Sequence, residues 1–154
     1  MNKQKYLFVV EKPSLKKILE KSFKKNKNKI DYDIDIVISN NCVVDLYEPA
    51  LRSSIDRLRE EPILKLQNRE IDERYRVVLG KWREKCGTII SQKIQTNEYD
   101  AIVNACDPDE EGELTFAYTV ESLQLYGLRQ KRFNFLSLSD VELRERFLIL
   151  NKEV

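Results

Sequence analysis

The fold of this chain is constrained most by residues 6–10, a run of five consecutive apolar residues near the N-terminus. The run is too short and too continuous for an exposed helix, and it is typical of a buried strand. Pro13 follows closely and suits the first turn of a helix. Between Leu15 and Phe23, apolar residues recur at helical spacing opposite a side rich in lysine. A strand that leads straight into an amphipathic helix predicts a crossover connection and a parallel sheet.

The same alternation of short apolar runs and helical patterns continues along the chain. We expect a polar loop over residues 24–29, an edge strand over 31–38, a strand over 42–47, a short helix over 50–58, a helix over 81–95, a central strand over 99–106, a helix over 114–125, a strand over 132–138 and a final helix opened by the capping box Ser139-Asp140-Val141-Glu142. The predicted buried stripe of the helix over 81–95 includes Ile89, and the last helix carries Val141 among its apolar residues. These elements predict an α/β fold with a mainly parallel central sheet and helices on both faces.

The absence of histidine limits the chemistry that this chain can support. The 154 residues form one expected domain, 1–154, and contain three widely spaced cysteines, Cys42, Cys86 and Cys106. Ser-His-Asp and Cys-His catalysis and imidazole-based zinc sites are excluded, which leaves carboxylates, lysines, arginines or a metal ion. Cysteines that are odd in number and far apart favour reduced thiols and a cytoplasmic protein. No apolar run approaches the roughly 20 residues needed to cross a bilayer.

Residues 107–113, with the sequence DPDEEGE, place five carboxylates between two apolar segments. Ligands of open α/β sheets bind at the carboxyl ends of strands, which is where this motif falls. Asp107 and Asp109 can present oxygens to one side of the loop, and Gly112 permits a tight entry into the next helix. Oxygen ligands suit Mg²⁺, which would relieve the repulsion among the carboxylates. The alternative is a solvated loop whose acids favour the helix dipole.

Glu11 and Lys12 directly follow the first strand. In a parallel sheet they lie at the same edge as Asp107. Burial and neighbouring carboxylates would raise the pKa of Glu11 and suit it to act as a general acid or base, while Lys12 would meet a phosphate. The alternative is that Glu11 is a surface carboxylate beside an ordinary helix start.

A strand ending in Glu-Lys-Pro-Ser at residues 11–14, followed by an apolar strand ending in Asp-Pro-Asp-x-Glu-Gly-Glu at 107–113, resembles the Toprim domain of type IA DNA topoisomerases, the topoisomerase III branch most closely. The resemblance covers essentially the whole chain. Residues 36–40 stand where that family has its second strand, and 132–135 where it has its closing strand. The resemblance implies a Toprim, Rossmann-like fold.

The resemblance also implies roles for individual residues. Asp107, Asp109 and Glu111 would hold Mg²⁺, Glu11 would act as the acid–base residue near the scissile phosphate, and Lys12 would contact the DNA backbone. In the family, a tyrosine on another domain attacks a single DNA strand and later releases it. The chain is expected to stop where the Toprim domain ends, so none of its seven tyrosines receives that role. We therefore expect part of a topoisomerase that is cytoplasmic and nucleoid-associated, and that does not relax DNA alone.

Two positions depart from the family pattern. Glu110 stands where the family usually has arginine, which reverses a charge close to the phosphate. The family also tends to have a Gly-His pair after its second strand, whereas residues 40–45 read NNCVVD. Weakened catalysis, an altered substrate and a degenerate paralogue are all compatible with these departures.

The lysines are concentrated at the N-terminal end of the chain. Residues 1–30 hold ten lysines and two glutamates, a charge of +8, and the other 124 residues carry −7. The cluster comprises Lys16, Lys17, Lys21, Lys24, Lys25, Lys27 and Lys29. It is either the solvated face of a helix or a contact surface for a nucleic-acid backbone.

Three functions follow from these patterns. The leading hypothesis is a Toprim domain that binds Mg²⁺ and assists cleavage and religation of single-stranded DNA, together with the remaining domains of a topoisomerase. The first alternative is a freestanding Toprim nuclease or primase-like protein. The second is a non-catalytic Toprim-like module that binds nucleic acid or a partner protein. No membrane partner is expected.

Overall fold

The structure is a computed structural model that describes residues 3–39 and 82–152. In that part of the chain, four strands form one parallel sheet in the order β2-β1-β3-β4. The strands are β1 (Gln4–Val10), β2 (Tyr32–Ile38), β3 (Ala101–Asn104) and β4 (Arg129–Arg132). β1 and β3 lie inside the sheet and β2 lies at an edge, as the sequence patterns predict. The strand expected over 42–47 and the helix expected over 50–58 fall outside the described residues.

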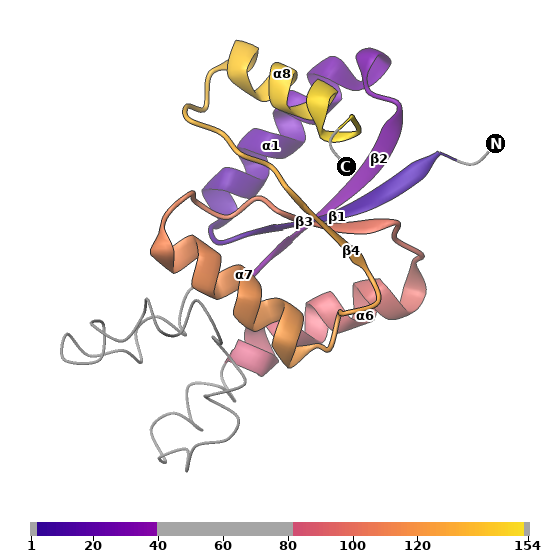
Figure 1. Ribbon diagram of the computed structural model, residues 1–154, viewed down its shortest axis with the longest axis vertical. Helices are drawn as coiled ribbons and strands as arrows, with labels where there is room; N and C mark the ends of the chain where they lie inside the picture. Colours follow the sequence, from indigo (N-terminus) through magenta and orange to yellow (C-terminus); the bar gives the residue numbers. More distant parts are fainter. Residues whose placement is uncertain (1–2, 40–81, 153–154) are drawn as a thin grey trace.

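Helices cover both faces of the sheet (Figure 1). They are α1 (Pro13–Asn26), α6 (Thr88–Thr96), α7 (Glu110–Ser122) and α8 (Asp140–Leu150). A 3-10 turn, η1 (Lys27–Lys29), follows α1, and a π-helical turn, η3 (Arg83–Gly87), precedes α6. α1 and α8 pack on one face, and α6 and α7 pack on the other. This arrangement confirms the prediction of an α/β fold with a parallel sheet, and it fits a Rossmann-like fold.

Aromatic rings fill the core between the sheet and the pair α1 and α8. Phe147 of α8 is fully buried. Its ring centroid lies 5.8 Å from that of Phe8, 5.7 Å from that of Phe23 and 4.8 Å from that of Phe133. The hydroxyl of Tyr32 donates a hydrogen bond of 2.6 Å to the carbonyl oxygen of Phe147. A single side chain of α8 thus ties this helix to α1, to β1 and to the segment after β4.

A short chain of hydrogen bonds lies in the core on the opposite face. The indole N–H of Trp82 donates to Oγ of Ser39 (3.1 Å), and this oxygen lies 2.6 Å from Oγ1 of Thr119. Because Thr119 donates its one hydroxyl proton to the carbonyl of Thr115 (2.8 Å), Ser39 is the donor to Thr119. Trp82, Ser39 and Thr119 are all fully buried, so the chain satisfies polar groups that water cannot reach.

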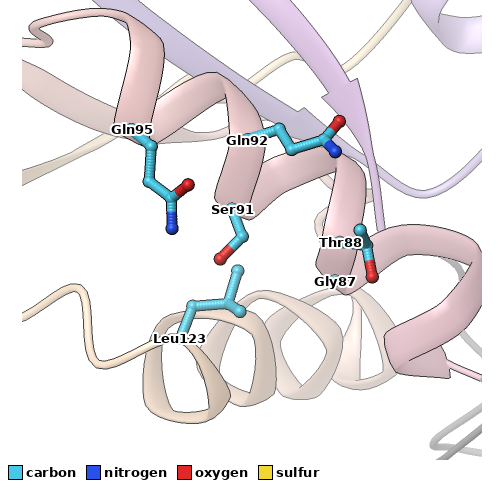
Figure 2. Close-up of a pocket in the computed structure, with 6 residues that line it drawn as sticks. All are labelled: Gly87, Thr88, Ser91, Gln92, Gln95 and Leu123. Atoms are coloured by element: carbon cyan, nitrogen blue, oxygen red, sulfur yellow. The ribbon is translucent and has the colours of Figure 1, made fainter.

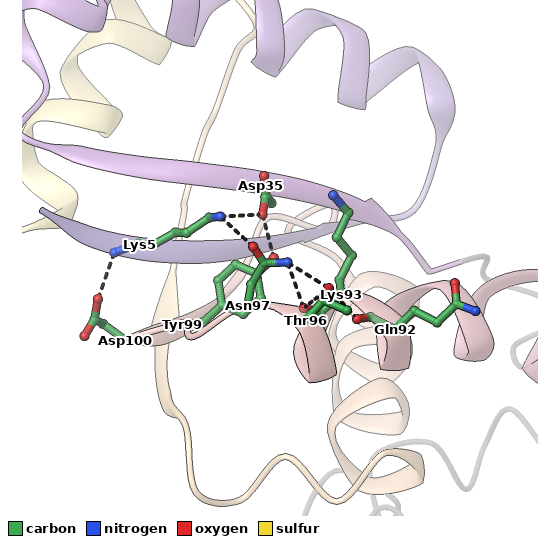
Figure 3. A network of polar contacts seen from close by, with 8 residues as sticks. All are labelled: Lys5, Asp35, Gln92, Lys93, Thr96, Asn97, Tyr99 and Asp100. Atoms are coloured by element: carbon green, nitrogen blue, oxygen red, sulfur yellow. Dashed lines mark hydrogen bonds and ion pairs between the residues drawn. The ribbon is translucent and has the colours of Figure 1, made fainter.

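Polar contacts fix the amino-terminal edge of the sheet (Figure 3). The ammonium of Lys5 donates to Oδ1 of Asn97 (3.0 Å) and lies 3.2 Å from Oδ2 of Asp35. The hydroxyl of Tyr99 donates to the same carboxylate oxygen at 2.6 Å. Although burial opposes ionisation, the bonds from Tyr99 and Lys5 lower the pKa of Asp35. The network joins β1, β2 and the segment before β3, which helps to set the strand register.

Two predicted segments differ from the observed elements. The polar loop expected over 24–29 is helical, because α1 continues to Asn26 and η1 follows. Lysine is a good helix former, and this segment contains neither glycine nor proline. The strand expected over 132–138 is also wrong, since β4 ends at Arg132. Phe133 and Phe135 are buried while their neighbours are exposed. The alternation of apolar and polar residues over this segment therefore indicates alternating burial, but the segment is not a strand.

Two apolar residues of the predicted helices are exposed, and one of them, Ile89, was expected in a buried stripe. Ile89 is 55% exposed and Val141 is 56% exposed. The π-helical turn before α6 shifts the phase of the helix, so Cys86 and Ile90 face the core and Ile89 does not. Val141 lies in the first turn of α8, whose predicted cap is present because Ser139 accepts the N–H of Glu142 at 3.2 Å.

Two further expectations concern the state of the cysteines and the presence of a helix that could cross a membrane. Among the described residues, Cys86 and Cys106 are buried and take part in no disulfide, in agreement with reduced thiols, and Cys42 lies outside the described residues. Across residues 3–39 and 82–152, none of the helices combines the length and apolarity that a bilayer crossing requires.

Truncation of Phe147 tests the packing of α8. Phe147→Ala should lower the free energy of unfolding by about 3–5 kcal/mol, because it removes a ring that contacts three others in a closed core. Val141→Ala on the same helix is the control and should change it by less than about 0.5 kcal/mol. Urea unfolding measures both. Equal effects of the two substitutions would contradict the observed orientation of α8.

Candidate carboxylate site at the carboxyl edge of the sheet

Glu11 and Asp107 meet where β1 and β3 end. The parallel register pairs Val9 with Asn104, so the residues that follow the two strands emerge side by side. The backbone N–H of Asp107 donates to Oε1 of Glu11 at 2.9 Å. The strand order reverses between β1 and β3, and in open α/β sheets ligands bind at such a switch point. The structure therefore brings these two residues together at the edge where the sequence places them.

Backbone hydrogen bonds hold the ends of the neighbouring strands in place. The N–H of Ala105 donates to the carbonyl of Val9 (3.0 Å), and the N–H of Ser39 donates to the carbonyl of Val10 (2.8 Å). The buried amide oxygen of Asn104 accepts the N–H of Cys106 at 3.1 Å. Hydrogen bonds thus hold the chain from the end of β3 up to Cys106, the residue before Asp107.

The carboxyl group of Glu11 is buried, with 6% of the residue exposed. Burial raises its pKa, the hydrogen bond from the Asp107 N–H lowers it, and the charges of Asp107 and Asp109 raise it further. The net result is a pKa above the ordinary value for glutamate. A carboxyl group that gains a proton more easily is suited to general acid–base chemistry, as the sequence predicts for Glu11.

Gly112 lets α7 approach the end of β3 very closely. A β-carbon at this position would lie 2.0 Å from the carbonyl oxygen of Asp107 and 3.0 Å from Oε1 of Glu11. The first distance is far inside van der Waals contact, and the carbonyl belongs to the backbone. Only glycine fits here without displacement of Asp107 and Glu11, so Gly112 sets the spacing of the whole site.

Part of the acidic motif has an ordinary structural role. The acidic loop is shorter than expected, because α7 begins at Glu110. Oδ1 of Asp109 accepts the N–H of Gly112 at 2.7 Å and caps the helix. Glu110, Glu111 and Glu113 occupy the first turn, where negative charge favours the helix dipole. The motif therefore starts a helix, as the alternative interpretation predicts, and it also places Asp107 in contact with Glu11 at this edge.

Lys12 and Arg132 bring positive charge to the carboxylates. The ammonium of Lys12 lies 3.9 Å from Oδ2 of Asp107, and its side chain is 62% exposed. Arg132, at the end of β4, forms an ion pair with Glu113, which raises the pKa of the guanidinium. Sequence reasoning placed Lys12 here but missed Arg132, because the end of β4 reaches this edge only through the strand order.

The acidic motif offers the kind of ligand that Mg²⁺ requires. The side chains of Asp107, Asp109 and Glu111 offer oxygen donors only, which is the chemistry that Mg²⁺ prefers. In their described orientations, no three Asp, Glu, Cys or His side chains within 3–39 and 82–152 are grouped so that they could share one ion. Glu11 and Asp107 are in contact through a backbone bond, while Asp109 turns one oxygen to its cap. The donors fit Mg²⁺ in kind, and Asp107 contacts the buried acid through its backbone N–H.

A cavity of about 430 Å³ lies elsewhere, between α6 and the end of α7 (Figure 2). Its lining residues are Gly87, Thr88, Ser91, Gln92, Gln95 and Leu123. They include no carboxylate, lysine or arginine, and none of the residues that the sequence predicts for the site. Hydroxyl and amide groups without a base or a charge offer little for catalysis. The carboxylate edge is therefore the better candidate site.

Substitution of Gly112 tests the close approach of α7. Gly112→Ala should lower the free energy of unfolding by about 3 kcal/mol, the upper part of the range for overpacking, because the new methyl group meets a backbone carbonyl. Gly127→Ala is the matched control. Gly127 has open space around its Cα and no positive φ, so alanine there should be neutral or stabilise by up to about 1 kcal/mol. Denaturant unfolding that shows no difference between the two variants would refute the tight contact.

The raised pKa of Glu11 predicts the sign of a pH dependence. Protonated Glu11 stabilises the folded state below the ordinary pKa of 4.5, and this contribution is lost as the pH rises through the higher folded-state value. Glu11→Gln keeps the acceptor for the Asp107 N–H and removes the charge. In buffer with EDTA, the variant should be the more stable protein at neutral pH, and its advantage should shrink towards pH 4.5.

Glu142→Gln supplies a control of opposite sign. Hydrogen bonds from the Leu136 N–H and from Arg146 lower the pKa of Glu142, so its contribution to stability is present at neutral pH and is lost as the pH falls. Thermal unfolding across the pH range measures both variants. An advantage of Glu11→Gln that is constant with pH would contradict the buried, high-pKa state of Glu11.

Comparisons with protein-family models, with curated proteins and with solved structures gave no match to this chain. The functional assignment therefore depends on the geometry of the carboxylate edge and on the resemblance of residues 11–14 and 107–113 to the Toprim motifs.

Proposed function

We propose that this chain is the Toprim domain of a type IA DNA topoisomerase and that its carboxylate edge binds Mg²⁺ beside a DNA phosphate. One observation carries the proposal: Glu11 and Asp107 follow two adjacent parallel strands and are joined by a hydrogen bond of 2.9 Å at the topological switch point. The two halves of the resembled motif, which are far apart in the sequence, thus meet at one edge of the sheet.

Different residues of this edge would bind the metal ion, transfer the proton and contact the phosphate. Asp107, Asp109 and Glu111 would hold the Mg²⁺ ion once their side chains turn towards one point, because they are not grouped there in the described orientations. Oδ1 of Asp109 caps α7, which leaves Oδ2 for this role. A bound Mg²⁺ would supply stabilisation of the negative charge that builds up on a phosphate during strand transfer. Glu11 would carry a proton to or from the reacting oxygen, and exposed Lys12 would contact the phosphate backbone.

The tyrosines of the described residues do not offer a nucleophile. Tyr6, Tyr32, Tyr99 and Tyr118 are buried. Burial raises the pKa of Tyr6, Tyr32 and Tyr99, which makes their phenolate forms rare. Tyr126 is exposed, and a hydrogen bond with Glu121 raises its pKa as well. These properties agree with a nucleophile supplied by another domain, so the chain alone should bind metal and DNA without relaxing supercoiled DNA.

Metal-dependent stabilisation tests the proposal. Mg²⁺ or Mn²⁺ should raise the free energy of unfolding by about 2.7 kcal/mol at a metal concentration about 100-fold above Kd. Asp107→Asn should abolish this gain, because it removes a charged donor from the edge. Asp33→Asn on β2 is the control and should retain it. Each variant is compared with its own baseline in EDTA, since Asp107→Asn also relieves repulsion.

The outcomes distinguish the alternatives. A chain that neither metal stabilises, and in which Asp107→Asn changes nothing, would not be a metal-dependent Toprim domain. Retained DNA binding in that case would favour a non-catalytic binding module. Nicking of DNA or primer synthesis by the purified chain would instead favour a freestanding Toprim enzyme.

A further inference from the structure

The outer side of α1 and η1 is a strongly positive surface. Residues 12–29 contain eight lysines and a single acid, Glu20. Three of these lysines have ion-pair partners: Lys12 with Asp107, Lys16 with Glu20 and Lys25 with Asp140. The other five are exposed and form no ion pair within the described residues; they are Lys17, Lys21, Lys24, Lys27 and Lys29, and we call them the lysine face.

The ammonium groups of the lysine face repel one another. Lys17 and Lys21 are four residues apart on α1, and Lys24 follows three residues later, so their ammonium groups are neighbours on one side of the helix. Like charges at these spacings destabilise a helix. An ordinary solvated face mixes both signs in similar numbers, whereas here Glu20 is the one acid of α1, and the five lysines have no ion-pair partner among the described residues. An external polyanion would supply the opposite charge.

A membrane surface is a poor partner for this helix. Basic amphipathic helices bind bilayers by inserting their apolar side. The apolar side of α1 is already in the core, where Leu15, Leu19 and Phe23 are buried against the sheet and α8. Only the charged side is available, which favours a partner that is recognised by its charge.

The position of α1 favours a long, extended polyanion. α1 begins at Pro13, two residues after Glu11, and runs away from the carboxylate edge for 14 residues, or about 21 Å. That length corresponds to about six phosphates of a strand in duplex geometry. Figure 1 shows the start of α1 beside the start of α7, where the acidic motif lies. A strand held at the carboxylate edge would pass along α1.

We propose that the lysine face of α1 and η1 binds the phosphate backbone of a nucleic-acid strand that continues from the carboxylate edge. The direction of the strand, with one phosphate beside Glu11 and Lys12, rests on the proposed function. The binding itself rests on the lysine charges that have no ion-pair partner within residues 3–39 and 82–152, on their exposed position and on the length of α1. Recognition by ammonium groups is independent of base sequence and is weakened by salt.

Fluorescence anisotropy of a labelled oligothymidylate tests the proposal on the whole chain, in EDTA so that no metal contributes. The triple variant K17Q/K21Q/K24Q should bind roughly tenfold more weakly at low salt. The slope of log affinity against log salt should fall by about 2 relative to the wild type, because three phosphate contacts to a single strand are lost. Glutamine has nearly the helix propensity of lysine, so α1 should fold in the variant, and circular dichroism verifies this.

The variant K3Q/K85Q/K93Q is matched in charge and removes three exposed lysines outside the lysine face. It should bind as the wild type does. Equal affinities and slopes for the two variants, or no binding by the wild-type chain, would overturn the proposal. Tighter binding of polyglutamate than of oligothymidylate would overturn it in favour of an acidic protein partner.

This test is separate from the test of the metal site. A lysine-dependent affinity in a chain that Mg²⁺ does not stabilise would leave the lysine face in place and remove the metal function. The reverse pair of results would keep the metal site and remove the path along α1.

Discussion

The hydrogen bond from the Asp107 N–H to Glu11 is the contact on which the rest of the site depends. It buries a carboxyl group at the junction of β1 and β3, and it fixes the direction in which the chain leaves β3. Gly112 then allows α7 to start directly against that junction. A larger residue at 112 or a different register of β1 and β3 would separate the acidic motif from Glu11. The function that we propose is therefore a consequence of packing as much as of the identity of the acids.

The distribution of charge gives the molecule two different surfaces. The carboxylate edge gathers Glu11, Asp107 and the acids of the first turn of α7, with Lys12 and Arg132 as nearby cations. The lysine face begins on α1 and carries the opposite sign. A net charge of +1 hides this division, because the charge of +8 over residues 1–30 nearly cancels the −7 of the other 124 residues. A phosphate backbone with its own cations could bind across both, whereas a neutral partner would leave both uncompensated.

Much of the arrangement could be predicted from the sequence. The apolar runs correctly predicted β1 and β3. The rule that parallel strands end at one edge of the sheet predicted that Glu11 lies beside Asp107, as it does. The cap formed by Asp109 and the phase shift at the π-helical turn were not predicted, because each depends on local hydrogen bonding that alternative backbones also allow. Arg132 was missed for a different reason. Its place beside Glu113 follows from the position of β4 next to β3, which local patterns do not encode.

The central claim is that a buried Glu11 and the acidic motif form one electrostatic unit that takes up a divalent cation. The most direct measurement is the pKa of the Glu11 carboxyl group by carbon-13 NMR, first in EDTA and then with saturating Mg²⁺. We expect a value above that of ordinary glutamate in EDTA, because the group is buried beside Asp107 and Asp109. Added Mg²⁺ should lower it, since a nearby cation favours the ionised form. An ordinary pKa that does not respond to Mg²⁺ would contradict the account.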